Sequence, residues 1–526
     1  MSPRGRPRGR SRRRAEPRNA REAIEALLDE ELGRRGFPIS LEAEAERAAS
    51  SAEGDERRDL TGLPTFTVDP ATARDFDDAV SARREGEATR LWIHIADVAA
   101  HVRPGSSLDR EARRRGNSTY VPGTVEPMLP RALSEDACSL SPGVERLAVT
   151  AEIDLDPDGA PREASFYRSR IRSDARLDYD QLDVVFSGRT AAPEQVAEPL
   201  ALARDAAARL GRQRNDRRGL TVETAEPEFR FDRSGDVVGA RAVPQTESHS
   251  LIERLMILTN EQVAQLLERR RVPAIYRVHG EPDPPRVERM IGQLHALGIP
   301  TPPLRGSLAP REAGQLAAEA SRLVAREASR RGHGREAYTS LVLRSLQQAG
   351  YSDRNTGHAG LGSAAYCHFT SPIRRYPDLV VHRALLRELG LGDDPLPDDL
   401  PGVAEHASER EREAAKLEYL ADEICLAWLL EERLRERGWE EPWQGEIIGH
   451  IGAGLFARFG EVFEGFLPAR RLPGEFFELN VTGTALAGRR TGRTYRLGDP
   501  IEVRVESVSR GEGQVELALA ERGGLG

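Results

Sequence analysis

Four aspartates lie within a stretch of ten residues in the segment TVDPATARDFDDAV, where Arg74 is the only cation. The four are Asp69, Asp75, Asp77 and Asp78. In an extended chain Asp75 and Asp77 point to one side and Asp78 to the other, because successive side chains alternate. All four converge only if the chain turns here, which Pro70 and the Asp-rich composition favour.

Carboxylates gathered at one turn need bound protons or cations. At about 5 Å separation each like-charge pair costs roughly 3 kcal/mol at an effective dielectric constant of about 20. Hard oxygen ligands suit Mg²⁺, for which Mn²⁺ can substitute, and Mg²⁺ held by few protein ligands keeps positions open for phosphate. Two such ions would activate a water and stabilise the leaving oxygen of a phosphodiester. The alternatives are a solvated acidic turn and a calcium loop, although the segment lacks the glycine and terminal glutamate of an EF-hand.

A second motif, HFTSPIRRYPDLVVH, places two arginines between two prolines. Pro372 and Pro377 bracket Arg374 and Arg375 and stiffen the loop. Guanidinium groups bind phosphate through paired donors and keep their charge. The motif therefore predicts a phosphate contact. The alternative is a loop leading into a helix, with arginines that pair with nearby acids.

The secondary structure that is expected to position these motifs changes along the chain, from strands to helices and back to strands. Apolar, β-rich runs predict strands over 91–98 and 148–155. Ser107 is expected to cap a short helix over 108–115 that Gly116 ends. Further helices are predicted over 20–35, 250–270, 286–297, 311–330, 337–348 and 403–437. Five short strands after Trp443, with Gly-rich turns, predict a closed barrel of the OB type, so the fold class is α+β.

The composition of the chain bears on its expected location in the cell and on a basic segment at its start. The net charge is −9, yet residues 1–14 carry seven arginines and no acid, so residues 1–20 are predicted to be a disordered basic arm. That arm either contacts RNA phosphates or is a solvated tail. No run of eighteen apolar residues exists and no apolar stretch follows the basic start, so neither a membrane span nor a secretory signal is expected. Three widely spaced cysteines, Cys138, Cys367 and Cys425, argue against disulfide or zinc frameworks and favour the cytoplasm.

Together the two motifs closely resemble the ribonuclease II/ribonuclease R family, whose catalytic module is the RNB domain. The resemblance extends through LWIHIADVAAHVRPGSSLDREARRRGNSTYVPG, PMLPRALSEDACSL, HSLIERLMILTNEQVA, IYRVHGEPD and LRSLQQAGYSDRNTGHAGLGSAAYCHFTSPIRRYPDLVVHR. The terminal barrel resembles the family's S1 RNA-binding domain, most clearly in TYRLGDPIEVRVESV. The resemblance implies a helical segment and linker over 21–60, an RNB domain over 61–440 built on a mixed β-sheet wrapped by helices, and an S1 domain over 443–522.

The resemblance also implies roles for the two motifs. It implies that Asp69, Asp75, Asp77 and Asp78 hold Mg²⁺ at the bottom of a narrow RNA channel. Asp77 matches an aspartate needed for catalysis but not for RNA binding. Arg374 matches an arginine on the scissile phosphate, where it would stabilise charge in the transition state, and Arg375 matches a contact to the RNA backbone.

Further RNA contacts are expected outside the two motifs. By resemblance, Tyr120 in NSTYVPG lies near the terminal nucleotides and helps to set product length, and Tyr179 in ARLDYDQL stacks near the 3′ end. Glu253 in SLIERLM reads ribose hydroxyls and so helps to separate RNA from DNA. Independently of the resemblance, Phe456 and Arg458 lie on a predicted barrel strand and suit base stacking and phosphate contact.

The sequence departs from the family in two places. Family members carry two cold-shock domains before the catalytic domain, whereas about 60 residues precede Leu63 here, too few for one such domain and the basic arm. Val222 stands where the family often has an aromatic residue that completes the stack on the terminal bases. Loss of one stack costs about 1–3 kcal/mol, so an altered end-product length is expected, and Val222→Phe is expected to change the limit product on a denaturing gel.

The expected activity is hydrolysis of RNA from its 3′ end with release of nucleoside 5′-monophosphates. The expected partner is single-stranded RNA, or structured RNA with a 3′ overhang, and the chain is expected to be a monomer. One alternative is an inactive RNA-binding regulator on an RNB scaffold, which loss of an acidic ligand or of the loop arginine would mark. Another is a metal-dependent phosphodiesterase with a different substrate, against which the S1-like barrel and Glu253 speak.

Overall fold

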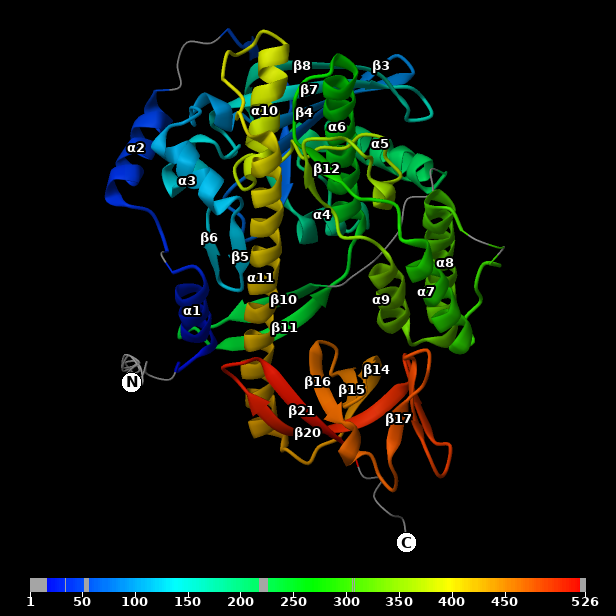
Figure 1. The fold of residues 1–526 in the computed structure, drawn as a ribbon. Helices are drawn as coiled ribbons and strands as arrows, with labels where there is room; N and C mark the ends of the chain where they lie inside the picture. The colour runs from blue at the N-terminus through cyan, green and yellow to red at the C-terminus, as the bar shows by residue number, and fades with distance from the viewer. Residues whose placement is uncertain are drawn as a thin grey trace, which may run out of the picture.

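Helices surround a mixed β-sheet in the upper part of the molecule, and a small β-barrel lies below it (Figure 1). The computed structural model describes residues 17–520 except 34, 52–55, 217–225, 305 and 307. The helices are α1 (Ala20–Glu31), α2 (Ile39–Ser50), α3 (Ser107–Arg115), α4 (Tyr179–Phe186), α5 (Ala197–Asp216), α6 (Glu247–Arg270), α7 (Pro284–Ala296), α8 (Pro310–Arg331), α9 (Arg335–Ser345), α10 (Tyr376–Glu388) and α11 (Leu400–Arg437).

The upper sheet has the strand order β1-β8-β7-β4-β3-β2-β9. Its strands are β1 (Arg58–Asp59), β2 (Phe66–Asp69), β3 (Asp78–Glu85), β4 (Ala88–Ala96), β7 (Glu145–Leu155), β8 (Pro161–Arg172) and β9 (Ala175–Asp178). The strands from β8 to β2 pair antiparallel, and β1 and β9 add parallel edges. Successive residues from Leu91 to Ala96 are buried, so β4 is covered on both faces and forms the centre of the core.

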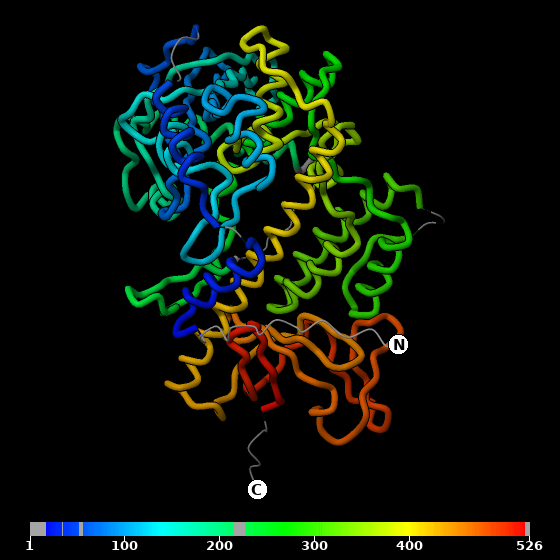
Figure 2. The backbone as a smooth tube through the Cα atoms, turned by 60° about the vertical axis from the view of Figure 1, so that its left-hand side comes forward, coloured from blue at the N-terminus to red at the C-terminus, as the bar shows by residue number. Residues whose placement is uncertain are grey.

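Three two-stranded sheets and a group of three helices lie outside the upper sheet. The paired strands are β5 (Thr119–Val121) with β6 (Thr124–Glu126), β10 (Glu226–Phe231) with β11 (Val237–Val243), and β12 (Tyr276–Val278) with β13 (Gly350–Ser352). Helices α7, α8 and α9 share a separate hydrophobic cluster, which Leu497 from the barrel joins. Figure 2 shows this helical group beside α11 and above the barrel.

Helix α11 joins the upper body to the barrel. Its 38 residues span about 57 Å at 1.5 Å per residue. In Figure 1 it runs from beside α10 down to the barrel. Its lower half shares one hydrophobic cluster with α1, the β10–β11 hairpin and the barrel. That shared core fixes the barrel beneath the upper body.

The barrel closes from five strands in the order β14-β15-β16-β21-β20, with β20 pairing back to β14. They are β14 (Trp443–Ile451), β15 (Gly454–Phe459), β16 (Phe463–Pro468), β20 (Pro500–Ser509) and β21 (Gln514–Leu519). These are the five strands expected from the sequence. A three-stranded sheet, β17 (Phe477–Leu479), β18 (Ala485–Gly488) and β19 (Thr494–Arg496), is inserted between β16 and β20 and was not expected.

Several sequence expectations can be compared with the structure. The helix over 108–115 forms, and Gly116 ends it with a positive φ of 73°. Its cap is Ser106 rather than Ser107, because the Ser106 side chain accepts a hydrogen bond from the Asp109 N–H. Val222 and residues 1–16 of the predicted arm lie outside the described residues. Among the described residues no helix is long and apolar enough to cross a membrane.

Candidate active site

The acidic segment forms a turn between two neighbouring strands of the upper sheet. Asp69 ends β2 and Asp78 begins β3, so the chain reverses between them. The predicted turn is confirmed. Asp69 also pairs with Asp178 of β9, which ties the first aspartate to the edge of the sheet. The sheet therefore holds both ends of the segment, and Asp75 and Asp77 lie on the loop between them.

Two residues that the sequence reasoning did not single out hold this loop. Ser139 is buried, accepts a hydrogen bond from the Phe76 N–H at 3.0 Å and donates one to the Arg74 carbonyl at 2.8 Å. The Arg176 guanidinium donates to the carbonyls of Pro70, Ala71 and Ala73 at 3.1, 2.7 and 3.4 Å. Both contact backbone atoms far away in the chain, so no local pattern identifies them.

The arginine loop lies directly against the acidic loop. The Ile373 N–H donates to Asp77 Oδ1 at 2.8 Å, and Arg374 Nε lies 3.5 Å from Asp77 Oδ2. The Ser118 N–H donates to the Arg374 carbonyl at 2.9 Å, which ties this loop to the chain just before β5. Almost 300 residues separate Asp77 and Ile373. The structure therefore brings the two predicted motifs together.

Burial raises the pKa of Asp69, Asp77 and Asp78. Burial is the largest cause for Asp69, where the nearby charges of Asp78 and Asp75 also act, and together they raise its pKa to about 8. Burial likewise raises the pKa of Asp77 well above its usual range, against the opposing charge of Arg374. The pKa of Asp78 is raised for the same reason, with Arg374 and Arg375 opposing. The cluster thus holds more negative charge than its surroundings stabilise.

Both candidate tyrosines lie beside the cluster. The Tyr120 hydroxyl donates to Asp75 Oδ2 at 2.6 Å, while its side chain remains 36% exposed. Tyr179 begins α4, and its ring stacks on His249 with centroids 4.0 Å apart. Burial, Asp78 and Asp69 raise the pKa of Tyr179, so its ring is close enough to sense both charges. The two tyrosines come from different elements and flank the carboxylates.

Other candidate residues have protein partners in the structure. The Arg375 guanidinium binds Asp378 Oδ1 at 2.7 Å, which matches the alternative of an arginine paired with a nearby acid. Glu253 accepts hydrogen bonds from Arg214 and Gln245, each at 3.0 Å. Contacts of Arg375 and Glu253 with RNA stay predictions.

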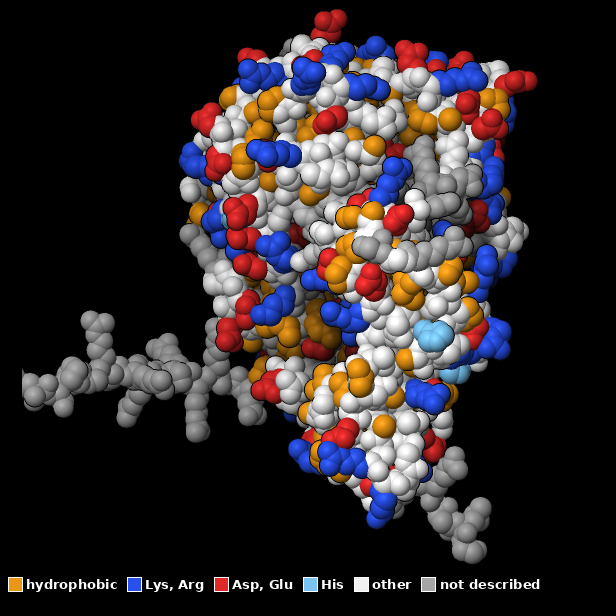
Figure 3. All heavy atoms as spheres, turned by 45° about the vertical axis from the view of Figure 1, so that its right-hand side comes forward, with side chains coloured by type: hydrophobic (Ala, Val, Ile, Leu, Met, Phe, Trp, Pro, Cys, Tyr) orange, Lys and Arg blue, Asp and Glu red, His pale blue; other side chains and the backbone are white. Residues whose placement is uncertain are grey.

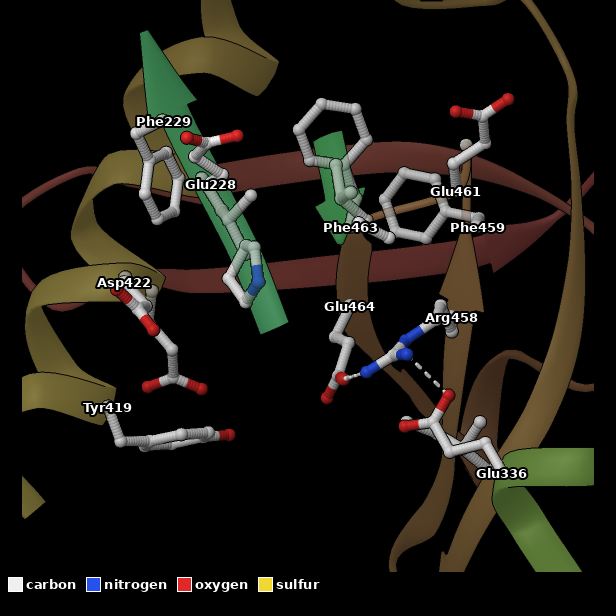
Figure 4. Close-up of a pocket in the computed structure, with 18 of the residues that line it drawn as sticks. Glu228, Phe229, Glu336, Tyr419, Asp422, Arg458, Phe459, Glu461, Phe463 and Glu464 are labelled. Carbon is white, nitrogen blue, oxygen red and sulfur yellow. Dashed lines mark hydrogen bonds and ion pairs between the residues drawn. The ribbon is translucent and has the colours of Figure 1, made fainter. Parts of the chain in front are cut away.

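The two predicted RNA-binding residues of the barrel differ in how accessible they are to RNA. Phe456 is 37% exposed, and its ring leans on Phe466 with centroids 5.1 Å apart. Arg458 lies between two acids, with its guanidinium 2.5 Å from both Glu336 of α9 and Glu464 of β16 (Figure 4). An RNA phosphate would have to compete with both acids for Arg458. Phe456 instead keeps an exposed surface that a base could contact.

The acidic cluster has features that fit a divalent cation. Asp69 Oδ2 and Asp77 Oδ2 are buried and have no hydrogen-bond partner among the described residues. In the described part of the chain, no three or more His, Cys, Asp or Glu side chains lie together closely enough to hold a metal ion by themselves. Mg²⁺ does not require such a group, because it usually keeps several waters and binds through one or two carboxylates and substrate phosphates. The donor set therefore suits Mg²⁺ better than a metal that needs a complete protein cage.

The raised pKa of Asp69 predicts a stability change. An aspartate with a folded-state pKa of about 8 and an unfolded value near about 3.9 destabilises the fold increasingly as pH rises between those values. We expect Asp69→Asn to raise Tm in metal-free buffer, with a gain that grows across that pH range. Mg²⁺ should raise the Tm of the unaltered protein more than that of the variant, because it binds only the folded state. Differential scanning calorimetry checks both effects, with the exposed Asp158→Asn as the control. A Tm gain for Asp69→Asn that matches the control at every pH would contradict this electrostatic account.

A large cavity leads from this cluster to the barrel. Its volume is about 2060 Å³, and its lining includes Thr72 and Tyr120 at one end and strands of the barrel at the other. Figure 3 shows a hollow in the surface above the barrel, with acidic and basic side chains around it. We call this cavity the vestibule. Tyr120 lines it and also contacts Asp75, so the vestibule reaches the acidic cluster.

The vestibule wall is more acidic than basic. The arginines that line it are Arg230, Arg335 and Arg458. The acids that line it are Glu228, Glu336, Glu418, Asp422, Glu423, Glu446, Glu461 and Glu464. Figure 4 shows the Tyr419 ring in the wall contributed by α11, and this side chain is 57% exposed. Tyr419 was not identified from the sequence, because one tyrosine in a long charged helix gives no signal.

Comparison with known proteins agrees with the two motifs. Residues 57–390 match the family described as RNB domain. The chain is 34% identical over 481 residues to ribonuclease R of Escherichia coli (strain K12), covering 88% of this chain and 57% of that protein. It is 33% identical over 493 residues to ribonuclease R 1 of Lactococcus lactis, covering 91% and 58%. The chain thus spans less than two thirds of the length of these relatives.

Solved structures agree with the sequence match. The structure of Mycoplasma genitalium RNase R in complex with ribose-methylated single-stranded RNA has a TM-score of 0.86 and 28% identity, covering 95% of this chain and 78% of that one. The same RNase R in complex with double-stranded RNA has a TM-score of 0.80 and 26% identity, covering 95% and 83%. The family match includes both the acidic loop and the arginine loop and extends over more than half of the chain. The protein therefore belongs to the RNB domain family.

Proposed function

We propose that the protein is a 3′-to-5′ exoribonuclease that hydrolyses RNA phosphodiester bonds and releases nucleoside 5′-monophosphates. The observation that carries the proposal is the contact between Arg374 and Asp77 beside a vestibule that leads to the barrel. The guanidinium can bind a phosphate directly, and the neighbouring carboxylates, whose negative charge is only partly balanced, can bind divalent cations that contact the same phosphate. This combination suits a reaction at that phosphate. The ribonuclease R relatives, which are longer than this chain, support the same reaction.

The proposed catalytic centre combines the four aspartates with Arg374. The ligands of Mg²⁺ would come from Asp69, Asp75, Asp77 and Asp78. Bound Mg²⁺ would activate the attacking water and stabilise the leaving 3′ oxygen. Arg374 is 45% exposed on its side chain, so its guanidinium can turn from Asp77 to the scissile phosphate and stabilise charge there. Ile373 keeps its hydrogen bond to Asp77 Oδ1 and so orients that carboxylate.

RNA is proposed to reach this centre through the vestibule with its 3′ end first. Tyr120 and Tyr179 flank the carboxylates and would stack on terminal bases. Glu253 would accept hydrogen bonds from ribose hydroxyls after exchanging its present partners. The barrel would act as an S1 RNA-binding domain, with Phe456 presenting its exposed face.

The second candidate function is RNA binding without catalysis. The RNB fold alone does not exclude it, because the yeast pseudonuclease Ssd1 shares this fold at a TM-score of 0.66 and 18% identity. The contact between Arg374 and Asp77 favours catalysis, since both the predicted acidic residues and the loop arginine are present and adjacent.

The substrate assignment is tested by incubating the protein with RNA and DNA of the same sequence in Mg²⁺. Thin-layer chromatography of the products should show nucleoside 5′-monophosphates from RNA, no products from DNA, and none from either in EDTA. Equal cleavage of DNA would contradict the ribonuclease assignment. Binding of RNA without any product would instead support the non-catalytic function.

The acidic wall of the vestibule predicts an unusual charge effect on RNA binding. Glu228 and Glu461 line the wall. Glu461 would repel RNA phosphates, and Glu228 pairs with Arg241 at 2.6 Å and so holds a cation that could otherwise bind them. We expect the double variant Glu228→Gln with Glu461→Gln to bind single-stranded RNA several-fold more tightly at low salt. The gain should fade at high salt, because the screening length falls to about 3 Å at 1 M.

Fluorescence anisotropy with labelled RNA in EDTA measures this effect. The control removes two exposed acids outside the vestibule lining, as Glu319→Gln with Asp158→Asn. If the control tightens RNA binding as much as the vestibule variant, the effect belongs to net charge and not to the vestibule.

A further inference from the structure

A second cavity, of about 410 Å³, is lined by residues of α5, α6 and β8. The arginines that line it are Arg162, Arg214, Arg254 and Arg269, and Glu261 is the only acid among the described lining residues. Arginines therefore outnumber acids in this cavity, whereas acids outnumber arginines in the vestibule lining. The chain as a whole has a net charge of −9. Guanidinium groups are the side chains best suited to holding phosphate. Arg214 and Arg162 also lie 3.0 and 3.9 Å from the acids Glu253 and Asp156, so an anion here would be held mainly by Arg254 and Arg269.

The position of Arg254 is set by the packing of two helices. Its Nη1 donates to the Ala207 carbonyl of α5 at 3.2 Å. A Cβ atom on Gly211 would come within 2.5 Å of Arg254 Cζ, so only glycine lets the guanidinium lie over α5 at this point. Among the described residues, this is the hydrogen bond that the guanidinium makes, and arginine carries five N–H groups, so the others can serve a ligand.

The rest of the lining offers what a nucleoside needs. Phe166 and Leu258 are 7% and 3% exposed and line the cavity with apolar surface. Gln262 and Gln265 follow on the same face of α6 and bring amide groups, each with a donor and an acceptor. Small-molecule sites usually combine apolar walls with a few polar groups in this way.

Contacts connect this cavity to the catalytic cluster. Arg214 lines the cavity, and its Nη1 binds Glu253 Oε1 at 3.0 Å. Glu253 lies one turn after His249 on α6, and His249 stacks on Tyr179 beside the carboxylates. The salt bridge between Arg214 and Glu253 therefore stands between the place where the product forms and the arginine-lined cavity.

We propose that this cavity binds a nucleoside 5′-monophosphate, the product of the reaction, on its way out of the catalytic centre. The phosphate would contact Arg254 and Arg269, and the nucleoside would lie against Phe166 and Leu258. The inference rests on the proposed function for the identity of the ligand, because hydrolysis from the 3′ end releases such a mononucleotide at each step. RNA enters by the vestibule, so a separate site for the product keeps the two from competing.

The test is isothermal titration calorimetry of AMP and, separately, of inorganic phosphate into the intact protein in EDTA. Without divalent ions the carboxylate cluster repels both probes, so binding reports on the arginine-lined cavity. We expect one AMP site per chain and at least a tenfold loss of affinity in Arg254→Ala with Arg269→Ala. The control, Arg212→Ala with Arg326→Ala, removes the same charge from exposed positions outside the cavity lining and should keep the affinity.

Each outcome decides a separate point. Absence of AMP binding in the unaltered protein, or equal affinity in both double variants, would overturn the site. Phosphate binding as tight as AMP binding would overturn the nucleoside part. These binding measurements do not depend on activity, so a failure of the AMP site can be distinguished from a failure of the exoribonuclease assignment. A protein that degrades RNA but does not bind AMP would contradict only this inference.

Discussion

Asp77→Asn is expected to lower the turnover of RNA at least about a thousandfold while leaving RNA affinity nearly unchanged. The charge of Asp77 would be lost from the metal site, and about 4 kcal/mol of transition-state stabilisation corresponds to a thousandfold in rate. The amide keeps an oxygen that can accept the Ile373 N–H, so the arginine loop stays in place. Single-turnover kinetics with labelled RNA in Mg²⁺ measure the rate, and anisotropy in EDTA measures the affinity.

The matched control for Asp77 is Asp158→Asn, which removes one exposed carboxylate from a turn away from the cluster. It should retain full turnover. Asp77→Asn turnover within tenfold of the unaltered protein would mean that this carboxylate is not part of the catalytic centre. A loss of RNA affinity as large as the loss of turnover would mean that Asp77 stabilises the fold or binds RNA and does not take part in catalysis.

Arg374→Ala is expected to lower kcat by about a hundredfold to a thousandfold, the usual effect of removing one group that stabilises transition-state charge. Arg374→Lys should recover only part of this loss, because lysine cannot form the paired hydrogen bonds of a guanidinium. The side chain is 45% exposed, so neither variant should change Tm appreciably. Steady-state kinetics and calorimetry together check these expectations.

Two other arginines serve as controls for Arg374. Arg74 lies in the acidic loop, is 76% exposed and is 3.6 Å from Glu135, so Arg74→Ala should leave kcat within about twofold. Arg375 is paired with the fully buried Asp378, and removing one partner of a buried pair costs about 3–5 kcal/mol. Arg375→Ala should therefore lower Tm strongly. An Arg374→Ala variant that behaves like Arg375→Ala would show that Arg374 has a structural and not a catalytic role.

The sequence could predict elements whose pattern is local. The barrel strands alternate buried and exposed residues between Gly-rich turns, and the long helices over 250–270 and 403–437 show helical spacing, so all of these were found. Helix α10 was not predicted, because nearly all of its residues are buried and it has no polar face to set a period. Strand β8 was also missed, since its first half is largely polar and part-exposed.

The candidate site likewise contains residues that a local sequence pattern predicts and residues that no such pattern predicts. The acidic loop and the arginine loop each have a dense local motif, and the structure places the two loops next to each other. Ser139 and Arg176 bind backbone carbonyls of the acidic loop, 65 and 105 residues away in the chain, and no sequence spacing encodes such contacts. Arg458 was chosen for its place between aromatic residues, but its partner Glu336 lies on α9, more than a hundred residues earlier. Only the tertiary structure shows that acids already occupy this arginine.

The central claim is tested most directly by digestion of a 5′-labelled single-stranded RNA, followed over time on a denaturing gel. The account predicts a ladder that shortens from the 3′ end to a short limit product with Mg²⁺, and intact RNA in EDTA or with Asp77→Asn. Intact RNA with the unaltered protein in Mg²⁺, together with tight RNA binding, would contradict the catalytic assignment. Cleavage at internal positions would contradict the proposal that RNA threads 3′ end first through the vestibule.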